Sequence, residues 1–219
     1  MKINFYTEIH KALRRLLYNL AIEVGNYDFH ANEGYRQIHQ KVLYVTNLLR
    51  LHANHEERYL QSFIEQEISP AAHTIQEEHQ HQEEELTRLE NMSNMLLSLH
   101  GKNAIEPGLS FYRAFNKFIS DYLAHMEEEE RIMELLQALC TEEALFNTLA
   151  PLIQNMPKNE AIESIAYLIP AISPIERLNI LKGFLQDPNS NFAKEALKKA
   201  QDALLIDDWL ALKNALQVP

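Results

Sequence analysis

Apolar side chains recur every three to four positions through the first 140 residues of this chain, and few glycines or prolines interrupt them. This spacing is typical of amphipathic helices, and no stretch alternates apolar and polar residues beside turn residues as strands do. With only 5 glycines among 219 residues, the sequence predicts an all-α protein. Four long helices are expected, over residues 3–24, 32–67, 69–100 and 109–139.

Residues that begin or end helices mark the boundaries of these four. Gly25 follows the first helix, and Ser69 with Pro70 is predicted to supply an N-cap and a first-turn proline for the third. The run Glu106-Pro107-Gly108 is predicted to break the chain before the fourth helix, because proline lacks a backbone donor and glycine has low helix propensity.

After residue 140 the helical stretches shorten and prolines become frequent. Ser173 and Glu176 form a predicted capping box, and Asp207 with Asp208 is predicted to cap the last helix. We therefore expect two domains, a helical bundle over residues 1–140 and an extension of short helices over residues 141–219.

Charge and cysteine content exclude several classes of function. Lys and Arg number 20 against 31 Asp and Glu, for a net charge of −11, so no nucleic-acid partner is expected. The single cysteine, Cys140, rules out an internal disulfide and cysteine-rich zinc or iron–sulfur sites. No apolar stretch approaches the roughly 18–20 residues of a membrane span, and residues 1–8 lack the apolar segment of a signal peptide. A cytoplasmic protein without a membrane partner is expected.

Histidines occupy apolar faces on all four predicted long helices. Side chains four residues apart differ by about 40° around a helix, so the aromatic stripe of the fourth helix continues onto His125 and Glu129. The stripe of the second helix continues in the same way onto His52 and Glu56. The first helix adds His10 and the third adds His79, and Glu83 lies one turn after His79. The candidate metal ligands are therefore His10, His52, Glu56, His79, Glu83, His125 and Glu129.

A single histidine on an apolar face is more often a hydrogen-bonded core residue than a metal ligand. Four such histidines with two carboxylates are different, because burying the carboxylates without compensation costs several kcal/mol. A cation removes that cost, since neutral imidazole nitrogens and carboxylate oxygens are its ligands. Metal binding is therefore favoured over a polar core that holds no metal.

The two carboxylates lie on opposing helices and each is able to bridge, which predicts a pair of ions. A nitrogen-rich ligand set with oxygen bridges suits iron, with manganese and zinc as alternatives. Di-iron sites of ferritin-like bundles use Glu-x-x-His pairs and more carboxylates than histidines. Here the order is His-x-x-x-Glu and histidines are in the majority.

Four segments carry a specific resemblance: Ile9-His10-Lys11-Ala12-Leu13-Arg14, His52-Ala53-Asn54-His55-Glu56-Glu57, Glu78-His79 and His125-Met126-Glu127-Glu128-Glu129-Glu130. Over about residues 1–140 the chain resembles hemerythrin-like proteins, which contain the HHE cation-binding domain. The resemblance implies an up-down-up-down four-helix bundle around a non-heme di-iron centre. It also implies that the terminal ligands are His10, His52, His79 and His125, and that the bridging ligands are Glu56 and Glu129. Residues 169–177 resemble C-terminal extensions of some bacterial members.

One position departs from the oxygen-carrying members of that family, which have a second histidine one turn after the first on the third helix. Here that position is Glu83. The glutamate either ligates as a carboxylate, leaves a coordination position open or turns outward. Metal binding is expected in each case.

Three functions follow from this interpretation. The first is a di-iron protein that binds or senses dioxygen, iron or a related small ligand such as nitric oxide, and it is favoured over an enzyme. The second is a redox enzyme of the peroxidase or oxidase type at the same centre. The third is an interaction protein with a structural metal site, whose C-terminal helices bind a protein partner. No catalytic residue is assigned.

Overall fold

The structure, a computed structural model, describes residues 6–31, 33–185 and 190–217. These residues form helices and turns and no strand, which confirms the all-α class. The helices are α1 Tyr6–Gly25, α2 Tyr35–Tyr59, α3 Gln61–Glu67, α4 Ser69–Leu96, α5 Lys102–Leu139, α6 Glu142–Asn155, α7 Lys158–Leu168, the 3-10 turn η1 Ile169–Ala171, α8 Pro174–Phe184, α9 Asn191–Ala203 and α10 Ile206–Leu216. Among the described residues, no helix is long and apolar enough to cross a membrane.

Internal contacts divide the chain into two units. The first contains Leu16–Leu152, and the second joins the described residues of Phe5–Arg15 to those of Ile153–Pro219. The predicted boundary after residue 140 stays a prediction, and α6 groups largely with the helices that precede it.

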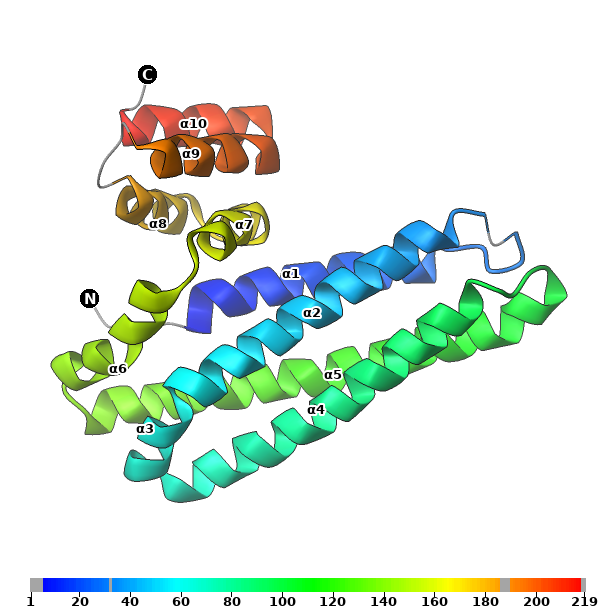
Figure 1. Cartoon of the computed structure of the whole chain (residues 1–219), viewed down its shortest axis with the longest axis horizontal. Coiled ribbons are helices and arrows are strands. Elements are labelled where there is room, and N and C mark those ends of the chain that lie inside the picture. Colours follow the sequence, from blue (N-terminus) through cyan, green and yellow to red (C-terminus); the bar gives the residue numbers. More distant parts are fainter. Residues whose placement is uncertain (1–5, 32, 186–189, 218–219) are drawn as a thin grey trace. The chain divides into compact units, whose positions relative to one another are not determined.

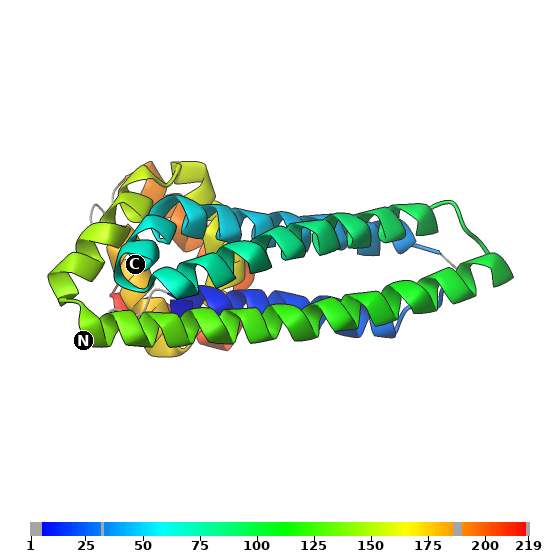
Figure 2. The same cartoon turned by 90° about the horizontal axis from the view of Figure 1, so that it is seen from below.

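The first unit is an antiparallel bundle of long helices. Helices α2, α4 and α5 alternate in direction and lie side by side, and the short α3 occupies the turn between α2 and α4 (Figures 1 and 2). The second half of α1 completes the bundle, since Lys41 Nζ donates to Glu23 Oε1 at 2.7 Å and Gly25 approaches the ring of Tyr112 on α5. This arrangement agrees with the expected up-down-up-down bundle.

The helix predicted over residues 32–67 is interrupted. At Leu60 φ widens to −111° with ψ at −35°, a distortion within the right-handed helical region, and α2 ends before α3 begins. Leu60 and Ile64 are buried, and Gln61 Nε2 donates to the carbonyl of Ala72 at 2.9 Å. Packing against α4 therefore overrides local helix propensity at this point. The predicted helix starts at Ile3 and Asn32 lie outside the described residues.

The predicted break at Glu106-Pro107-Gly108 is wrong, because α5 runs through it from Lys102. The proline lies in the second turn, where its missing donor forfeits one bond to a carbonyl near the helix start. Gly108 has a packing role instead: a Cβ at this position would lie 2.2 Å from Cγ of Phe29. The turn that separates α4 from α5 is at Gly101, whose φ of 58° favours glycine.

The predicted helix caps have different outcomes. The capping box is confirmed, since the Ser173 N–H donates to Glu176 Oε2 at 2.7 Å. Ser69 is already helical and Ile68 is the cap residue of α4, a shift of one position. The cap of the last helix is wrong: Leu205 precedes α10, and Asp207 and Asp208 lie in its first turn.

The second unit has its own apolar core, formed by side chains of α7, η1, α8, α9 and α10 around Trp209 and Leu181. Arg177 is buried beside it, and its Nε donates to the carbonyls of Ile169 at 2.9 Å and Ile172 at 3.0 Å. These bonds satisfy a carbonyl at the start of the 3-10 turn and one just after its end.

Candidate metal centre

Five of the predicted ligands come together inside the first unit, on three helices. His52 and Glu56 lie on α2, His79 on α4, and His125 and Glu129 on α5, and all five side chains are buried. Each continues the apolar face of its helix, so the packing that buries the apolar residues also brings these polar groups together.

Glu56 lies between two histidines. Its Oε1 is 3.4 Å from Nε2 of His52, and its Oε2 is 3.4 Å from Nε2 of His79. Each oxygen of this carboxylate therefore faces a different imidazole, on α2 and on α4.

Glu129 has a similar position on α5. Its Oε1 is 2.9 Å from Nε2 of His125 and 3.5 Å from Nε2 of His79. The side chain is fully buried. His79 therefore faces both glutamates.

These residues form two overlapping groups. In the first, His52, Glu56 and Glu129 offer ligand atoms that lie within 4.8 Å of one another. In the second, Glu56, His79, His125 and Glu129 do the same within the same limit. Both glutamates belong to both groups.

Several of these buried atoms lack a hydrogen bond. Both carboxylate oxygens of Glu56 and both ring nitrogens of His79 are buried and have no hydrogen-bond partner. A buried polar group left in this state costs about 1–3 kcal/mol, and more when it is charged. Carboxylate oxygens and imidazole nitrogens are donors to a metal ion, so the residues fit a bound cation that would satisfy them.

The electrostatics of the cluster reflect two carboxylates in a dry environment. Burial and the nearby charge of Glu129 raise the pKa of Glu56 well above its usual value. Burial alone would lower the pKa of His79, but Glu129 and Glu56 outweigh it and raise that pKa to about 10. Without a cation, a proton on His79 partly neutralises the carboxylates.

Tyr122 borders the cluster on α5. Its ring centroid is 5.8 Å from that of His125, and burial together with Glu129 and Glu56 raises the pKa of its phenol well above the usual value. The phenol therefore stays protonated beside the glutamates.

Two carboxylates that were not predicted as site residues contact the histidines from outside. Glu78 Oε2 is 2.6 Å from Nδ1 of His125, and Glu57 Oε1 is 3.5 Å from Nδ1 of His79. The hydrogen bond between Glu78 and Nδ1 of His125 sets the orientation of that ring and leaves its Nε2 for a metal. Nδ1 of His79 has no hydrogen bond, so Glu57 does not fix the ring of His79 in this way. Glu78 is on α4 and His125 on α5, so a pattern within one helix could not reveal the pair.

Glu83 lies outside both groups. Its carboxylate accepts hydrogen bonds from Nε of Arg50, at 3.0 and 2.8 Å, and its side chain is 54% exposed. Of the three alternatives for this position, the structure has the outward one. Arg50 on α2 supplies the charge complement that holds the glutamate at the surface.

His10 belongs to the second unit, on the first half of α1. Its side chain is fully buried, and its ring centroid is 4.8 Å from that of Tyr6. Ligation by His10 stays a prediction.

The first unit is an antiparallel helical bundle, and its buried histidine and glutamate groups could hold metal ions. These two features are those of a helical metal-binding protein. Residues 1–137 match the family model of the hemerythrin HHE cation-binding domain. The chain belongs to this family. Comparisons with curated proteins and with solved structures gave no significant match.

Proposed function

We propose that this protein is a non-heme di-iron protein that binds or senses dioxygen, iron or a related small ligand such as nitric oxide. One observation supports it most: two groups of buried donors share the same two glutamates. In this proposal Glu56 and Glu129 bridge the ions, and His52, His79 and His125 are terminal ligands.

The donor set supports iron as the metal. Its described members are imidazole nitrogens and carboxylate oxygens without a thiolate, a combination that suits iron and also manganese or zinc. Iron in the site would supply one-electron chemistry and a coordination position for a diatomic ligand.

We propose His10 as a further terminal ligand, on the basis of its position on the apolar face of α1 and its complete burial.

The chain's own residues orient these donors and exclude water. Glu78 holds the ring of His125 so that Nε2 faces Glu129. Phe118 and Tyr122 on α5 are buried and add an apolar wall, in which a neutral diatomic molecule is more soluble than an ion.

Metal content and visible absorption test the proposal together. Full-length protein produced with iron is expected to hold about two irons per chain, and His79→Ala is expected to lose iron. His81→Ala is the matched control, because His81 is exposed on the same helix. Iron-free protein from iron-replete cells, or equal iron in His79→Ala and wild type, would refute the di-iron centre.

The absorption of anaerobically reduced, iron-loaded protein before and after air separates the functions. A stable, reversible change supports ligand binding or sensing. Irreversible oxidation with turnover of peroxide and a reductant supports the redox-enzyme alternative. A protein partner of the C-terminal helices and a cytoplasmic location stay predictions.

A further inference from the structure

A pocket of about 600 Å³ opens between α2 and α4, beside the two ligand groups. Its charged lining residues are Arg50, Glu57, Glu83 and Glu84, and His79 forms part of its wall. Three carboxylates against one guanidinium give the lining a negative formal charge.

His79 connects this pocket to the metal-ligand groups. Only 5% of the residue is exposed, and its Nδ1, which has no hydrogen bond, lies 3.5 Å from Oε1 of Glu57 in the pocket. Its Nε2 lies 3.4 Å from Glu56 and 3.5 Å from Glu129. The same imidazole therefore faces a surface carboxylate on one side and the buried carboxylates on the other.

We propose that this pocket is the route by which a divalent cation reaches the centre, with Glu57 and Glu84 collecting the ion and His79 passing it to Glu56 and Glu129. The inference rests on the proposed metal-binding function. The acidic lining favours a cation over a neutral diatomic molecule, because carboxylates attract positive charge and supply oxygen ligands.

Arg50 does not cancel the charge of the whole pocket. Its guanidinium donates to Glu83 and to Glu90, at 2.8 Å and 2.5 Å, on the α4 side. Glu57 and Glu84 are exposed and make no ion pair with it among the described contacts. These two carboxylates are therefore available to an arriving ion.

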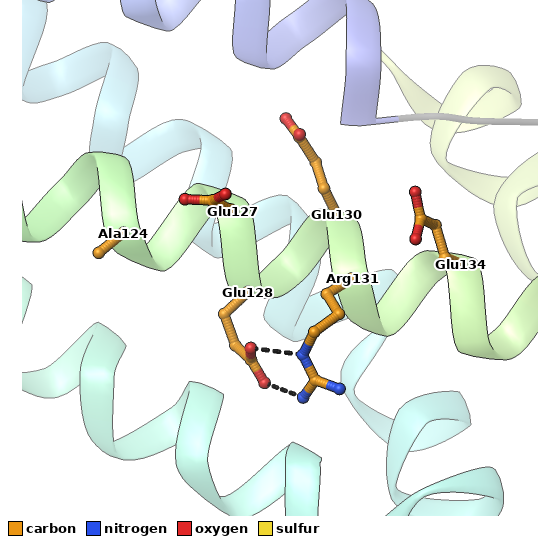
Figure 3. Close-up of a pocket in the computed structure, with 6 residues that line it drawn as sticks. All are labelled: Ala124, Glu127, Glu128, Glu130, Arg131 and Glu134. Atoms are coloured by element: carbon orange, nitrogen blue, oxygen red, sulfur yellow. Dashed lines mark hydrogen bonds and ion pairs between the residues drawn. The ribbon is translucent and has the colours of Figure 1, made fainter.

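A second acidic pocket on α5 provides an internal comparison. It measures about 540 Å³ and is lined by Glu127, Glu128, Glu130, Arg131 and Glu134 with Ala124 (Figure 3). Arg131 Nε donates to Glu128 Oε2 at 2.7 Å (Figure 3). This lining carries more negative charge but contains no histidine and no member of the ligand groups. Charge alone would favour the α5 pocket, whereas the proposal requires the pocket at His79.

The test measures the rate of anaerobic Fe²⁺ loading into full-length apoprotein, stopped at intervals with a coloured iron(II) chelator. The test variant is Glu57→Gln with Glu84→Gln. The matched control is Glu127→Gln with Glu134→Gln, which removes the same charge from exposed positions. At low ionic strength the test variant is expected to load about tenfold more slowly, and the control within about twofold of wild type. The final iron content is expected to be equal in all three proteins.

Equal slowing of both variants, or no slowing of the test variant, overturns the proposed route. The di-iron proposal still stands in that case if all three proteins reach the full iron content. A lower final iron content in the test variant alone also overturns it, since these glutamates would then be ligands. A wild-type chain that holds no iron overturns the proposed function and the route with it.

Discussion

His125 and His79 each have carboxylates near both nitrogens of the imidazole ring. His125 has Glu78 at 2.6 Å on Nδ1 and Glu129 at 2.9 Å on Nε2. His79 has Glu57 on one side and both buried glutamates on the other, at 3.4–3.5 Å. The tighter geometry at His125 makes Glu78 the residue that we expect to orient the site most strongly.

Glu78→Ala tests this role. Loss of the carboxylate frees the His125 ring to rotate and removes its effect on ligand basicity, so iron affinity is expected to fall about 10- to 100-fold. The measurement is iron retention against a series of chelator concentrations. Glu77→Ala is the control, because Glu77 is exposed on the same helix. Equal iron retention in the two variants would contradict an orienting role.

At the scale of the helix, the packing of α5 depends on a close contact that its own sequence does not predict. Gly108 lies under the ring of Phe29, whose nearest atoms would be 2.2–2.7 Å from an added Cβ. The phenylalanine is buried, so its ring has little room to move away.

Gly108→Ala is therefore expected to lower the free energy of unfolding by about 1–3 kcal/mol, although alanine is the better helix former. Gly183→Ala provides the comparison, since an added Cβ there meets nothing within 4 Å and is expected to stabilise by about 0.5–1 kcal/mol. Urea unfolding followed by circular dichroism measures both. A Gly108→Ala protein as stable as wild type would show that the Phe29 ring can shift.

The stability of the second unit depends on the turn between α7 and α8. Arg177 donates to two carbonyls of this turn and pairs with Asp208 at 3.0 Å. Arg177→Leu leaves buried carbonyls without donors, and we expect it to destabilise the unit by about 2–3 kcal/mol.

Fluorescence of Trp209, the single tryptophan and a member of the core of this unit, follows the unfolding. Asp208→Asn, which affects only a half-exposed ion pair, is expected to cost less than about 1 kcal/mol. An equal loss in both variants would assign the stabilisation to the ion pair instead of the carbonyl bonds.

In the whole molecule, the buried carboxylates link the free energy of folding to proton binding and to metal binding. Without metal, the folded state raises the pKa of His79 from 6.5 to about 10, and it also raises the pKa of Glu56. Both shifts mean that the folded state binds protons more tightly than the unfolded state. The stability that His79 contributes is therefore complete below pH 6.5 and is lost as the pH rises toward 10.

The apoprotein is thus expected to melt at a lower temperature at about pH 9 than at about pH 6.5. Metal ligands must be deprotonated, so iron binding has the opposite pH dependence, and the difference in melting temperature between loaded and apo protein should widen with pH. Thermal unfolding of both forms under anaerobic conditions measures this. An apoprotein whose melting temperature rises over that interval would contradict the raised pKa values.

Helical periodicity alone determined the class of fold and most of the candidate site. The 3.6-residue repeat assigns His52, Glu56, His125 and Glu129 to the apolar faces of their helices without reference to any other segment. The capping box at Ser173 is equally local, because its partners are three residues apart.

Only the tertiary structure decided how these faces meet. The helix rotations and distances that pair Glu78 with His125, turn Glu83 outward to Arg50 and seat Phe29 over Gly108 depend on contacts between segments far apart in the chain. The same holds for the interruption at Leu60, where burial against α4 outweighs local propensity. A sequence pattern specifies which side of a helix is apolar, whereas the packing of whole helices selects the atoms that come within bonding distance.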